Sequence, residues 1–366
     1  MEDFATWLRE TGPSAVAWGG LILGVIFGFT VQRSNFCSMG SLSDIHAFGD
    51  YKRFRIWMLS IAVAIAGTWL LGWADLVDIS RSMYLPALLP IGGSIVGGLL
   101  FGFGMVFAGG CATRNLVRVG SGDLRSLVVL IVMGLFAYMT IGGLLGPLRV
   151  LIFTPLSIDL SVMDADTQGL GDVLAALMGT SATTLTAVVA LVIVVALLVW
   201  CFSNRDFRAS PGAIAAGIVF GLCITAGWML TGLAFDEFAS TPIALESLTF
   251  VRPAGDTLDW LMRYTAGPVP DFGVATTFGT IAGAFIGAMI SGRFNVAGFA
   301  DRSDFLRNLF GAVFMGVGGV LALGCTIGQG MTGVSTLAIG SFIALIAIIA
   351  GGFAGLRVFD RLLEAE

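Results

Sequence analysis

Cysteines are the residues of this chain best suited to specific chemistry, and two of the five stand in matching surroundings. Cys111 follows Gly110, and Cys325 follows Gly324. Each closes a glycine-rich apolar segment that can leave helical geometry at little steric cost. A thiol at such a break can donate a weak hydrogen bond, contact another soft sulfur atom or exchange with a disulfide. Both positions are therefore candidates for a functional site.

The other three cysteines have less similar surroundings. Cys37 ends the segment Arg-Ser-Asn-Phe-Cys after the first apolar stretch, and we include it as a third candidate. Cys201 and Cys223 lie in apolar stretches without glycine breaks, so we expect them to fill space as small hydrophobic residues. The same packing role is the alternative for the two cysteines at glycine breaks. No two cysteines form a C-x-x-C pair, and their odd number does not indicate a disulfide framework.

Other kinds of site find little support in the sequence. The single histidine, His46, has no cluster of further ligands around it, so we expect no bound metal. The segment 328–333 resembles a phosphate-binding loop but lacks the Gly-Lys-Ser/Thr sequence that such a loop needs. No Ser/His/Asp grouping and no basic, aromatic surface for nucleic acid is evident. We therefore expect a protein that is not an enzyme, with no cofactor and no nucleic-acid partner.

The elements that position the cysteines are predicted to be membrane-spanning helices. Apolar residues make up 57% of the 366 positions and charged residues 12%, whereas a soluble domain carries about 25% charged residues. The acidic N-terminus is unlike a secretory signal peptide, so the first apolar stretch is expected to remain as a helix. We predict an all-α polytopic membrane protein with additional short or broken helices, and lipid around it. The apolar stretches predict nine spans, near residues 14–32, 55–74, 91–109, 125–146, 183–202, 211–231, 273–291, 308–323 and 336–355.

The distribution of basic residues predicts how these spans are oriented. With the N-terminus outside, fourteen of the nineteen Lys and Arg residues fall in inner loops and five in outer loops. Positive charge concentrates on the cytoplasmic side of membrane proteins. We therefore expect a multi-pass protein of the bacterial cytoplasmic (inner) membrane, with its N-terminus outside and its C-terminus inside.

The chain also resembles itself, which predicts two halves of opposite orientation. Residues 97–113 align with residues 311–327, with glycine or alanine matched at five positions, and residues 24–28 align with residues 217–221. An odd number of spans between the copies makes this an inverted-topology repeat. Chance alignment of glycine-rich helices is the alternative. The predicted organisation is a first repeat at 1–182, a connecting span at 183–210 and a second, inverted repeat at 211–366.

An inverted repeat places its substrate near the middle of the membrane, where helices are broken. Helices that start at Cys111 and Cys325 would direct their N-terminal N–H groups toward the same region, an arrangement that suits an anion. Arg33 and Arg114 lie close in sequence to two of the cysteines, so we include them as candidate pathway residues. Membrane topology alone is the alternative explanation for both arginines.

At these residues the sequence resembles the YeeE/YedE family of sulfur transporters, whose best-defined members transport thiosulfate. The resemblance covers residues 15–355 and is carried by the two glycine-rich segments that end in Cys111 and Cys325, together with Arg33, Phe36 and Cys37. It implies nine spans with additional short helices, an hourglass-shaped protein and three cysteines along a central pathway. This chain departs from the family in its long acidic outer loops, at 150–180 and 235–272, and acidic residues at the entrance would not favour a dianion.

The resemblance predicts uptake of a small sulfur-containing anion, thiosulfate above all, through a pathway lined by thiols. Apolar surroundings disfavour a thiolate, so we expect neutral thiols that each bind weakly. No nucleotide-binding motif is present, and a cytoplasmic sulfur-carrier protein is a candidate partner. Two alternatives remain open: a membrane-embedded thiol–disulfide oxidoreductase, and a transporter or channel for another sulfur or selenium compound.

Overall fold

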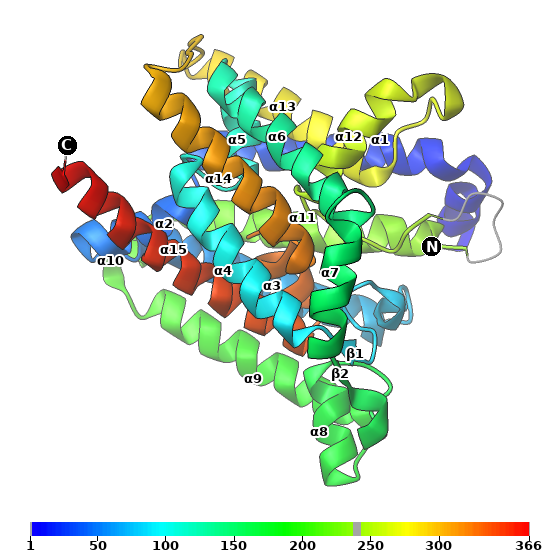
Figure 1. Ribbon diagram of the computed structural model, residues 1–366. Helices are drawn as coiled ribbons and strands as arrows, with labels where there is room; N and C mark the ends of the chain where they lie inside the picture. The colour runs from blue at the N-terminus through cyan, green and yellow to red at the C-terminus, as the bar shows by residue number, and fades with distance from the viewer. Residues whose placement is uncertain (1, 237–242, 366) are drawn as a thin grey trace.

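The computed structural model describes residues 2–236 and 243–365, and these form a bundle of long helices (Figure 1). Residues 237–242, within the second acidic loop, lie outside the described part. The long helices are α1 (Glu2–Ser34), α3 (Lys52–Trp73), α4 (Ile91–Phe107), α6 (Leu124–Ile141), α9 (Ala182–Phe202), α11 (Pro211–Ala234), α13 (Phe272–Ile290), α14 (Arg302–Leu321) and α15 (Ile339–Ala365). The shorter helices are α2 (Ser38–Phe48), α5 (Ala112–Gly120), α7 (Gly146–Phe153), α8 (Leu170–Met178), α10 (Arg205–Arg208) and α12 (Arg252–Met262).

The described residues contain nine helical segments that are long and apolar enough to cross a membrane, which confirms the predicted number and fold class. Each of the nine predicted stretches overlaps one of these segments. The first and third extend further than predicted, to Phe48 and Gly120, because α2 and α5 continue them. Two residues each in β1 (Leu88–Leu89) and β2 (Ile158–Asp159) pair antiparallel, with Leu88 opposite Asp159.

Glycine allows the central helices to approach closely. Helix α1 packs against α13 and α11, and α4 packs between α14 and α15. A Cβ atom added at Gly24 of α1 would lie 2.9 Å from the Cα atom of Gly279 in α13. At Gly104 of α4, an added Cβ atom would lie 2.8 Å from the carbonyl oxygen of Gly311 in α14. Small residues at helix crossings allow this contact in membrane proteins, where burial away from water cannot drive helix association.

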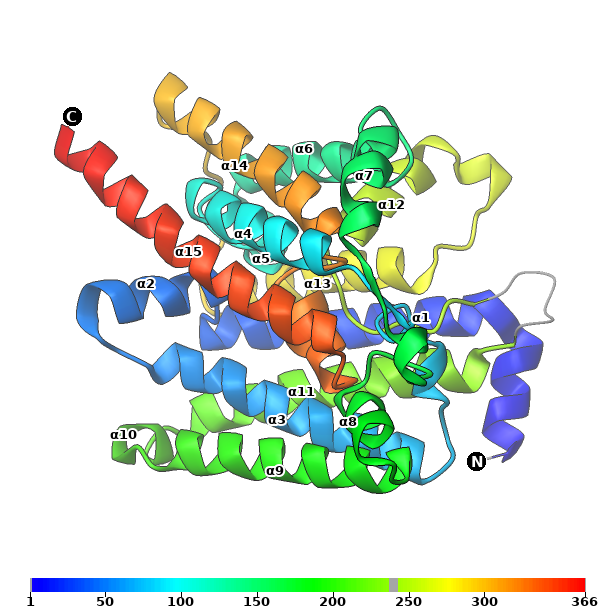
Figure 2. The ribbon, with the colours of Figure 1, turned by 60° about the horizontal axis from the view of Figure 1, so that its bottom comes forward.

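Helix α9 lies at the edge of the bundle (Figure 2). It packs against α3, α8 and the short α10, and leaves Leu191, Val195 and Val199 exposed. Cys201 at its C-terminal end is nevertheless buried, as is Cys223 in α11, so both occupy space in the protein interior.

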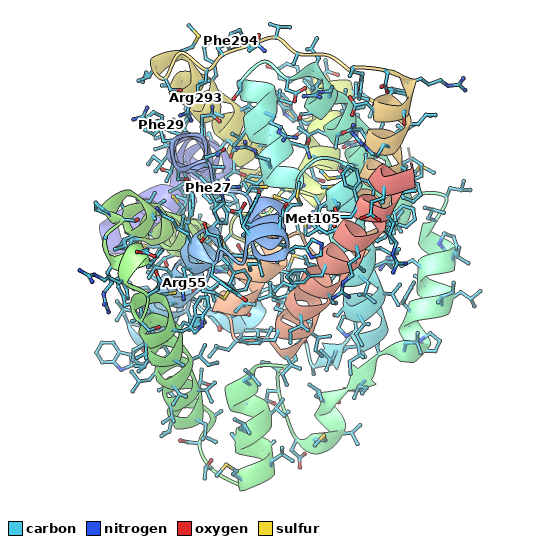
Figure 3. All side chains as sticks on the ribbon, turned by 90° about the vertical axis from the view of Figure 1, so that its left-hand side faces the viewer. Phe27, Phe29, Arg55, Met105, Arg293 and Phe294 are labelled. Atoms are coloured by element: carbon cyan, nitrogen blue, oxygen red, sulfur yellow. The ribbon has the colours of Figure 1, made fainter. Side chains whose placement is uncertain are left out.

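The two ends of the bundle carry different elements. The N-terminus, α7, α8 and α12 lie at one end, which we call the N-terminal side, and the C-terminus, α2 and α10 lie at the other, which we call the C-terminal side (Figure 1). Figure 3 views the molecule from the C-terminal side, with Phe27 and Met105 in the fully buried centre and Phe294 at the rim. The two acidic loops fold on the N-terminal side, where the described residues form α7, β2, α8 and α12.

Candidate substrate pathway

The first helix break lies between α4 and α5. Gly109 has φ 68° and Gly110 has φ 158°, both conformations that residues with a side chain rarely adopt. The Gly110 N–H donates to the Met105 carbonyl (2.9 Å) and so closes the end of α4. Cys111 then has extended backbone (φ −69°, ψ 172°) and stands at the N-cap position of α5. The sequence predicted both this break and the helix after it.

The second break, between α14 and α15, has the same backbone path. Leu323 has φ 59° and Gly324 has φ 158°, and the Gly324 N–H donates to the Gly319 carbonyl (2.7 Å). A leucine in left-handed backbone costs free energy, on the order of 1 kcal/mol, that the surrounding structure must offset. The continuation differs from the prediction: Cys325 leads into a π-helical segment, Gly328–Gly333, rather than a regular α-helix. The Gly328 N–H donates to the Cys325 sulfur (3.3 Å).

The third cysteine also stands at a helix start. Asn35 has φ 52°, which ends α1, and Cys37 is the N-cap residue of α2. Its sulfur accepts a hydrogen bond from the Gly40 N–H (3.3 Å). All three candidate cysteines therefore stand where a helical segment begins, although only two of them come after a glycine.

The fold brings the three thiols together in the protein interior. Cys37, Cys111 and Cys325 are 6%, 2% and 0% exposed. Cys37 lies directly beside Cys111, close enough for their thiols to interact, and Cys325 is near enough to Cys111 for the two groups to influence each other electrostatically. All five cysteines are free thiols. Three helix breaks from distant parts of the chain thus meet at one buried cluster, which we call the thiol cluster.

Buried polar side chains without a well-formed hydrogen bond lie in the chain segments that carry the three cysteines. The hydroxyls of Ser38 and Thr326 lie beside the Cys111 thiol, yet neither makes a well-formed hydrogen bond to any described residue. The Thr113 hydroxyl, the Asn115 Oδ1 atom and the Gln329 Oε1 atom are also buried without a partner in the described part of the chain. A buried polar atom left unpaired costs about 1–3 kcal/mol. Such a concentration of unpaired groups is the expected signature of a site for a polar ligand.

These polar residues were not among the candidates drawn from the sequence, although a signal was available. Ser38 directly follows Cys37, Thr326 directly follows Cys325, and Thr113 lies two residues after Cys111. A small hydroxyl residue just after each candidate cysteine was therefore visible. That these hydroxyls would have no other partner in the fold could not be seen from the sequence.

The candidate arginines occupy different places. Arg114 is half-buried on α5 and packs over the first break, where an added Cβ atom at Gly110 would lie 2.9 Å from the Arg114 Cγ atom. Arg118, one turn further, donates from Nη1 to the Gly109 carbonyl (2.7 Å). Arg33 is exposed and lines a separate cavity of about 780 Å³ on the C-terminal side, together with Lys52. The structure therefore brings Arg114, but not Arg33, to the thiol cluster.

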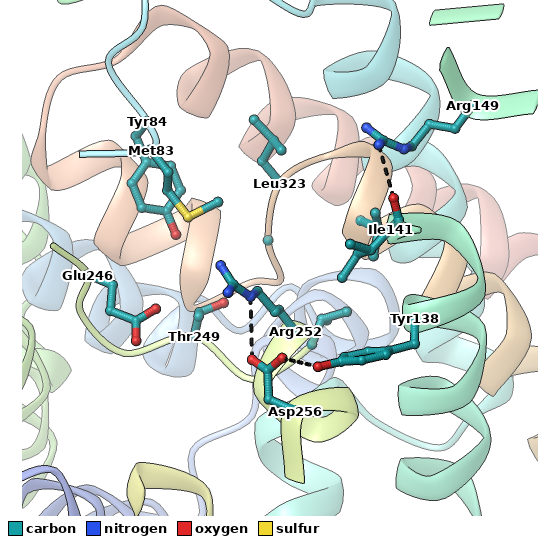
Figure 4. Close-up of a pocket in the computed structure, with 14 residues that line it drawn as sticks. Met83, Tyr84, Tyr138, Ile141, Arg149, Glu246, Thr249, Arg252, Asp256 and Leu323 are labelled. Carbon is teal, nitrogen blue, oxygen red and sulfur yellow. Dashed lines mark hydrogen bonds and ion pairs between the residues drawn. The ribbon is translucent and has the colours of Figure 1, made fainter. Parts of the chain in front are cut away.

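Two further cavities approach the breaks from opposite sides. A cavity of about 420 Å³ on the C-terminal side is lined by Gly109 of the first break and by Arg118. A cavity of about 340 Å³ on the N-terminal side is lined by Leu323 and Gly324 of the second break (Figure 4). The first break, next to Cys111, therefore adjoins a cavity on the C-terminal side, and the second break, next to Cys325, adjoins a cavity on the N-terminal side. No group of three or more His, Cys, Asp or Glu side chains suited to a metal ion occurs within residues 2–236 and 243–365.

Comparison with known proteins identifies the family. A family model described as sulphur transport matches residues 33–354, which include both breaks and all three candidate cysteines. The chain belongs to the sulphur transport family. This confirms the resemblance to YeeE/YedE proteins and places the chain among multi-span membrane transporters rather than enzymes.

Curated relatives cover nearly the whole chain. The thiosulfate transporter TsuA of Spirochaeta thermophila is 28% identical over 363 residues, which span 92% of this chain and 97% of that protein. The thiosulfate transporter TsuA of Escherichia coli is 27% identical over 354 residues, which span 91% of each chain. A probable transporter of Salmonella typhimurium, YedE, matches 29% of this chain at 28% identity.

Proposed function

We propose that this transporter takes up thiosulfate, or a closely related small sulfur anion, through a central pathway at the thiol cluster. The observation that carries the proposal is a set of buried hydroxyls without a well-formed hydrogen bond among the described residues: Ser38 and Thr326 lie beside the Cys111 thiol, and Thr113 lies two residues after Cys111. The names of two relatives that cover nearly the whole chain support thiosulfate in particular.

The two kinds of group match the two ends of thiosulfate. Its oxygen-bearing end is a hard acceptor, and hydroxyl groups can donate to it. Its terminal sulfur is soft and polarizable, and neutral thiols of Cys37, Cys111 and Cys325 can contact it without the repulsion that a thiolate would cause. Each contact is weak, so an ion that enters can also leave, as transport requires. The pathway in this proposal includes Gly110 and Gly324, which shape the two breaks.

Arg114 and the start of α5 supply positive potential to the same cluster. Arg114 packs over the first break, and the N-terminal end of α5 begins at Cys111. The N-terminus of a helix carries partial positive charge that favours an anion. Arg33, exposed in another cavity, is better explained by membrane topology than by contact with the substrate in the cluster.

The orientation and internal symmetry are part of the proposal. The charge distribution supports an N-terminal side that faces outward and a C-terminal side that faces the cytoplasm, in the bacterial inner membrane. The matching φ values of the two breaks support inverted repeats at 1–182 and 211–366, joined by 183–210. The exposed apolar face of α9 contacts lipid, and a cytoplasmic sulfur-carrier protein would receive its cargo at the C-terminal side.

Uptake of labelled thiosulfate by cells that lack their own carriers tests the proposal. Cys111→Ala and Cys325→Ala are expected to reduce uptake about tenfold or more, since a lost contact to a charged ligand is worth about 1.5–3 kcal/mol. Membrane abundance should stay close to that of the unmodified protein. Unlabelled thiosulfate should compete with the label better than sulfate or sulfite does.

Cys201→Ala and Cys223→Ala are the matched controls, because both of these buried thiols lie in long helices, outside the cluster. They should keep uptake near that of the unmodified protein. Equal losses in all four variants would show that the cysteines act only by packing. Absence of thiosulfate uptake by the unmodified protein, at normal abundance, would favour another sulfur or selenium compound as substrate.

A further inference from the structure

The cavity on the N-terminal side has features that the thiol cluster does not explain. Its lining includes the charged residues Glu246, Arg252 and Asp256, together with Tyr84 and Thr249 (Figure 4). We call it the outer vestibule, in keeping with the proposed orientation. Leu323 and Gly324 also line it, so it reaches within one residue of Cys325. This site was not predicted from the sequence, and the acidic composition of the 235–272 loop argued against an anion there.

Arg252 is the arginine of the vestibule whose guanidinium group can still bind a ligand. Its Nε atom lies 3.4 Å from an Asp256 carboxylate oxygen, and this is its ion pair among the described residues. Tyr138 donates to the other oxygen of Asp256 (2.6 Å), so that carboxylate is shared between two partners. The Arg252 side chain remains 54% exposed. Arg149, the other arginine of the vestibule, instead donates to the Thr140 and Ile141 carbonyls at the end of α6.

Glu246 faces the same space but is not paired with Arg252. Its main chain is fixed at both ends by Thr231, whose hydroxyl donates to the Glu246 carbonyl (2.7 Å) and accepts from its N–H (3.3 Å). Its carboxylate forms no hydrogen bond or ion pair with the described residues, and Figure 4 shows it apart from the paired Arg252 and Asp256 side chains. A half-buried carboxyl group without a partner is therefore directed into a cavity that holds an available guanidinium.

The surroundings of Glu246 favour its protonated form. Burial raises the pKa of Glu246 to about 8, the negative charges of Asp271 and Asp256 act in the same direction, and Arg252 opposes them. Tyr84, which faces the cavity from another element, is neutral at this pH with its ordinary pKa, and burial raises the pKa of its phenol further. At neutral pH the vestibule therefore holds a neutral Glu246, a paired Asp256 and the two arginines.

We propose that the outer vestibule is a second anion-binding site, in which Arg252 binds the oxygen atoms of the sulfur anion and Glu246 must be protonated for the anion to stay. The inference rests on the proposed function, because it takes the same anion as its ligand. A neutral Glu246 can donate a hydrogen bond to an oxyanion oxygen, whereas its carboxylate would repel a dianion. Binding of the anion and loss of the Glu246 proton are thus mutually exclusive.

Thiosulfate binding to the purified protein, measured by isothermal titration between about pH 6.5 and 9.5, tests this linkage. Thiosulfate remains a dianion over this range, so a change in affinity reports on the protein. The affinity should be constant below the Glu246 pKa of about 8 and should weaken above it, by up to about tenfold for each pH unit. A flat profile for the unmodified protein would overturn the inference without any variant.

Two variants test which residues determine the affinity for thiosulfate and its pH dependence. Glu246→Gln should bind thiosulfate with the same affinity at every pH, because the amide stays neutral. Arg252→Gln should weaken binding about tenfold to a hundredfold at all pH values, since it removes a charged hydrogen-bonding partner. Persistence of the full pH dependence in Glu246→Gln, or unchanged affinity in Arg252→Gln, would disprove the inference.

Matched controls come from the far end of α12. Asp259 and Arg263 form an ion pair at 3.6 Å and do not line the vestibule. Asp259→Asn and Arg263→Gln should keep the pH profile of the unmodified protein. Cys111→Ala separates the two proposals, because it should lose uptake and yet bind thiosulfate with the same pH dependence. Normal uptake combined with a flat binding profile would leave the proposed function standing and the vestibule site refuted.

Discussion

The helix breaks at Gly109–Cys111 and Leu323–Cys325 share a backbone path but lead into different structures. Their φ values agree within 10°, at 68° and 59° for the first residue, and are both 158° for the second. After Cys111 the chain enters α5, with Arg114 in its first turn. After Cys325 the residue equivalent to Arg114 is Gly328, in a π-helical segment whose residues are all buried.

The two breaks therefore differ in the charged side chains that lie near them. Asn115 and Gln329 hold equivalent positions, and each donates from its amide to a nearby carbonyl: Asn115 to Gly110 within the first break, and Gln329 to Ala322 just before the second. The first break carries its own cations and opens toward the C-terminal side. The second break and the π-helical segment after it contain no basic residue, and two arginines of other elements, Arg149 and Arg252, line the cavity beside it on the N-terminal side.

Impermeant labelling gives the largest expected difference between the two sides, because its outcome is all or none. Asp166 and Arg205 are both exposed, the first in the acidic loop on the N-terminal side and the second in α10 on the C-terminal side. With the proposed orientation, Asp166→Cys should react with an impermeant maleimide in intact cells and Arg205→Cys should not. Both should react after the cells are permeabilised. Reaction of Arg205→Cys in intact cells would reverse the assignment of the two sides.

Substitution of the second residue of each break with alanine, Gly110→Ala or Gly324→Ala, should destabilise the fold by different amounts. At Gly324 an added Cβ atom would meet backbone, 3.0 Å from the Gln329 nitrogen, whereas at Gly110 it would meet the flexible Arg114 side chain at 2.9 Å. Both substitutions also force a side chain into unfavourable backbone, so each should destabilise the fold by about 1–3 kcal/mol. Gly324→Ala should show the greater loss of thermal stability, measured by fluorescence-detected size exclusion.

Gly212→Ala is the control for this pair, because no atom lies within 4 Å of an added Cβ atom there and the position is helical. It should leave the melting temperature unchanged or raise it slightly, since alanine favours helix more than glycine does. Equal destabilisation by Gly110→Ala and Gly324→Ala would mean that the two breaks are equally tolerant, contrary to the difference in their surroundings.

The smallest expected effect distinguishes thiol contact from thiol exchange at the first break. Cys111→Ser keeps a hydrogen-bond donor but loses the soft sulfur, so uptake should fall only partly, to an activity between those of the unmodified protein and Cys111→Ala. A thiol–disulfide exchange mechanism would leave no activity, because serine cannot form a mixed disulfide. Uptake by the three proteins at matched membrane abundance provides the measurement.

Burial of a hydroxyl can cost more than burial of a thiol, so loss of activity in Cys111→Ser alone does not decide between the mechanisms. A mixed disulfide with substrate or partner protein, trapped on the unmodified protein, would refute the non-covalent pathway. The proximity of Cys37 to Cys111 makes these two thiols the ones to examine for such a bond.

The nine spans and the two glycine breaks could be predicted from the sequence because both depend on local properties. A membrane span results from the apolar character of about 20 consecutive residues, whatever those residues later contact. The breaks depend on Gly110 and Gly324, since glycine permits backbone that other residues resist. Leu323, however, adopts the same left-handed conformation as Gly109 without being glycine, and only the surrounding packing explains it.

Which side chains share a cavity was decided by the tertiary structure alone. Arg33 and Arg114 appeared equivalent as candidates, yet one is exposed in a separate cavity and the other packs on the first break. Glu246 and Arg252 belong to a loop whose acidic composition suggested repulsion of an anion, yet only Asp256 is paired with Arg252 and burial raises the pKa of Glu246. Composition counts the charges along the chain. The electrostatic potential at a site depends instead on which charged groups are paired, which are protonated and which face the same cavity. Helix packing determines each of these properties.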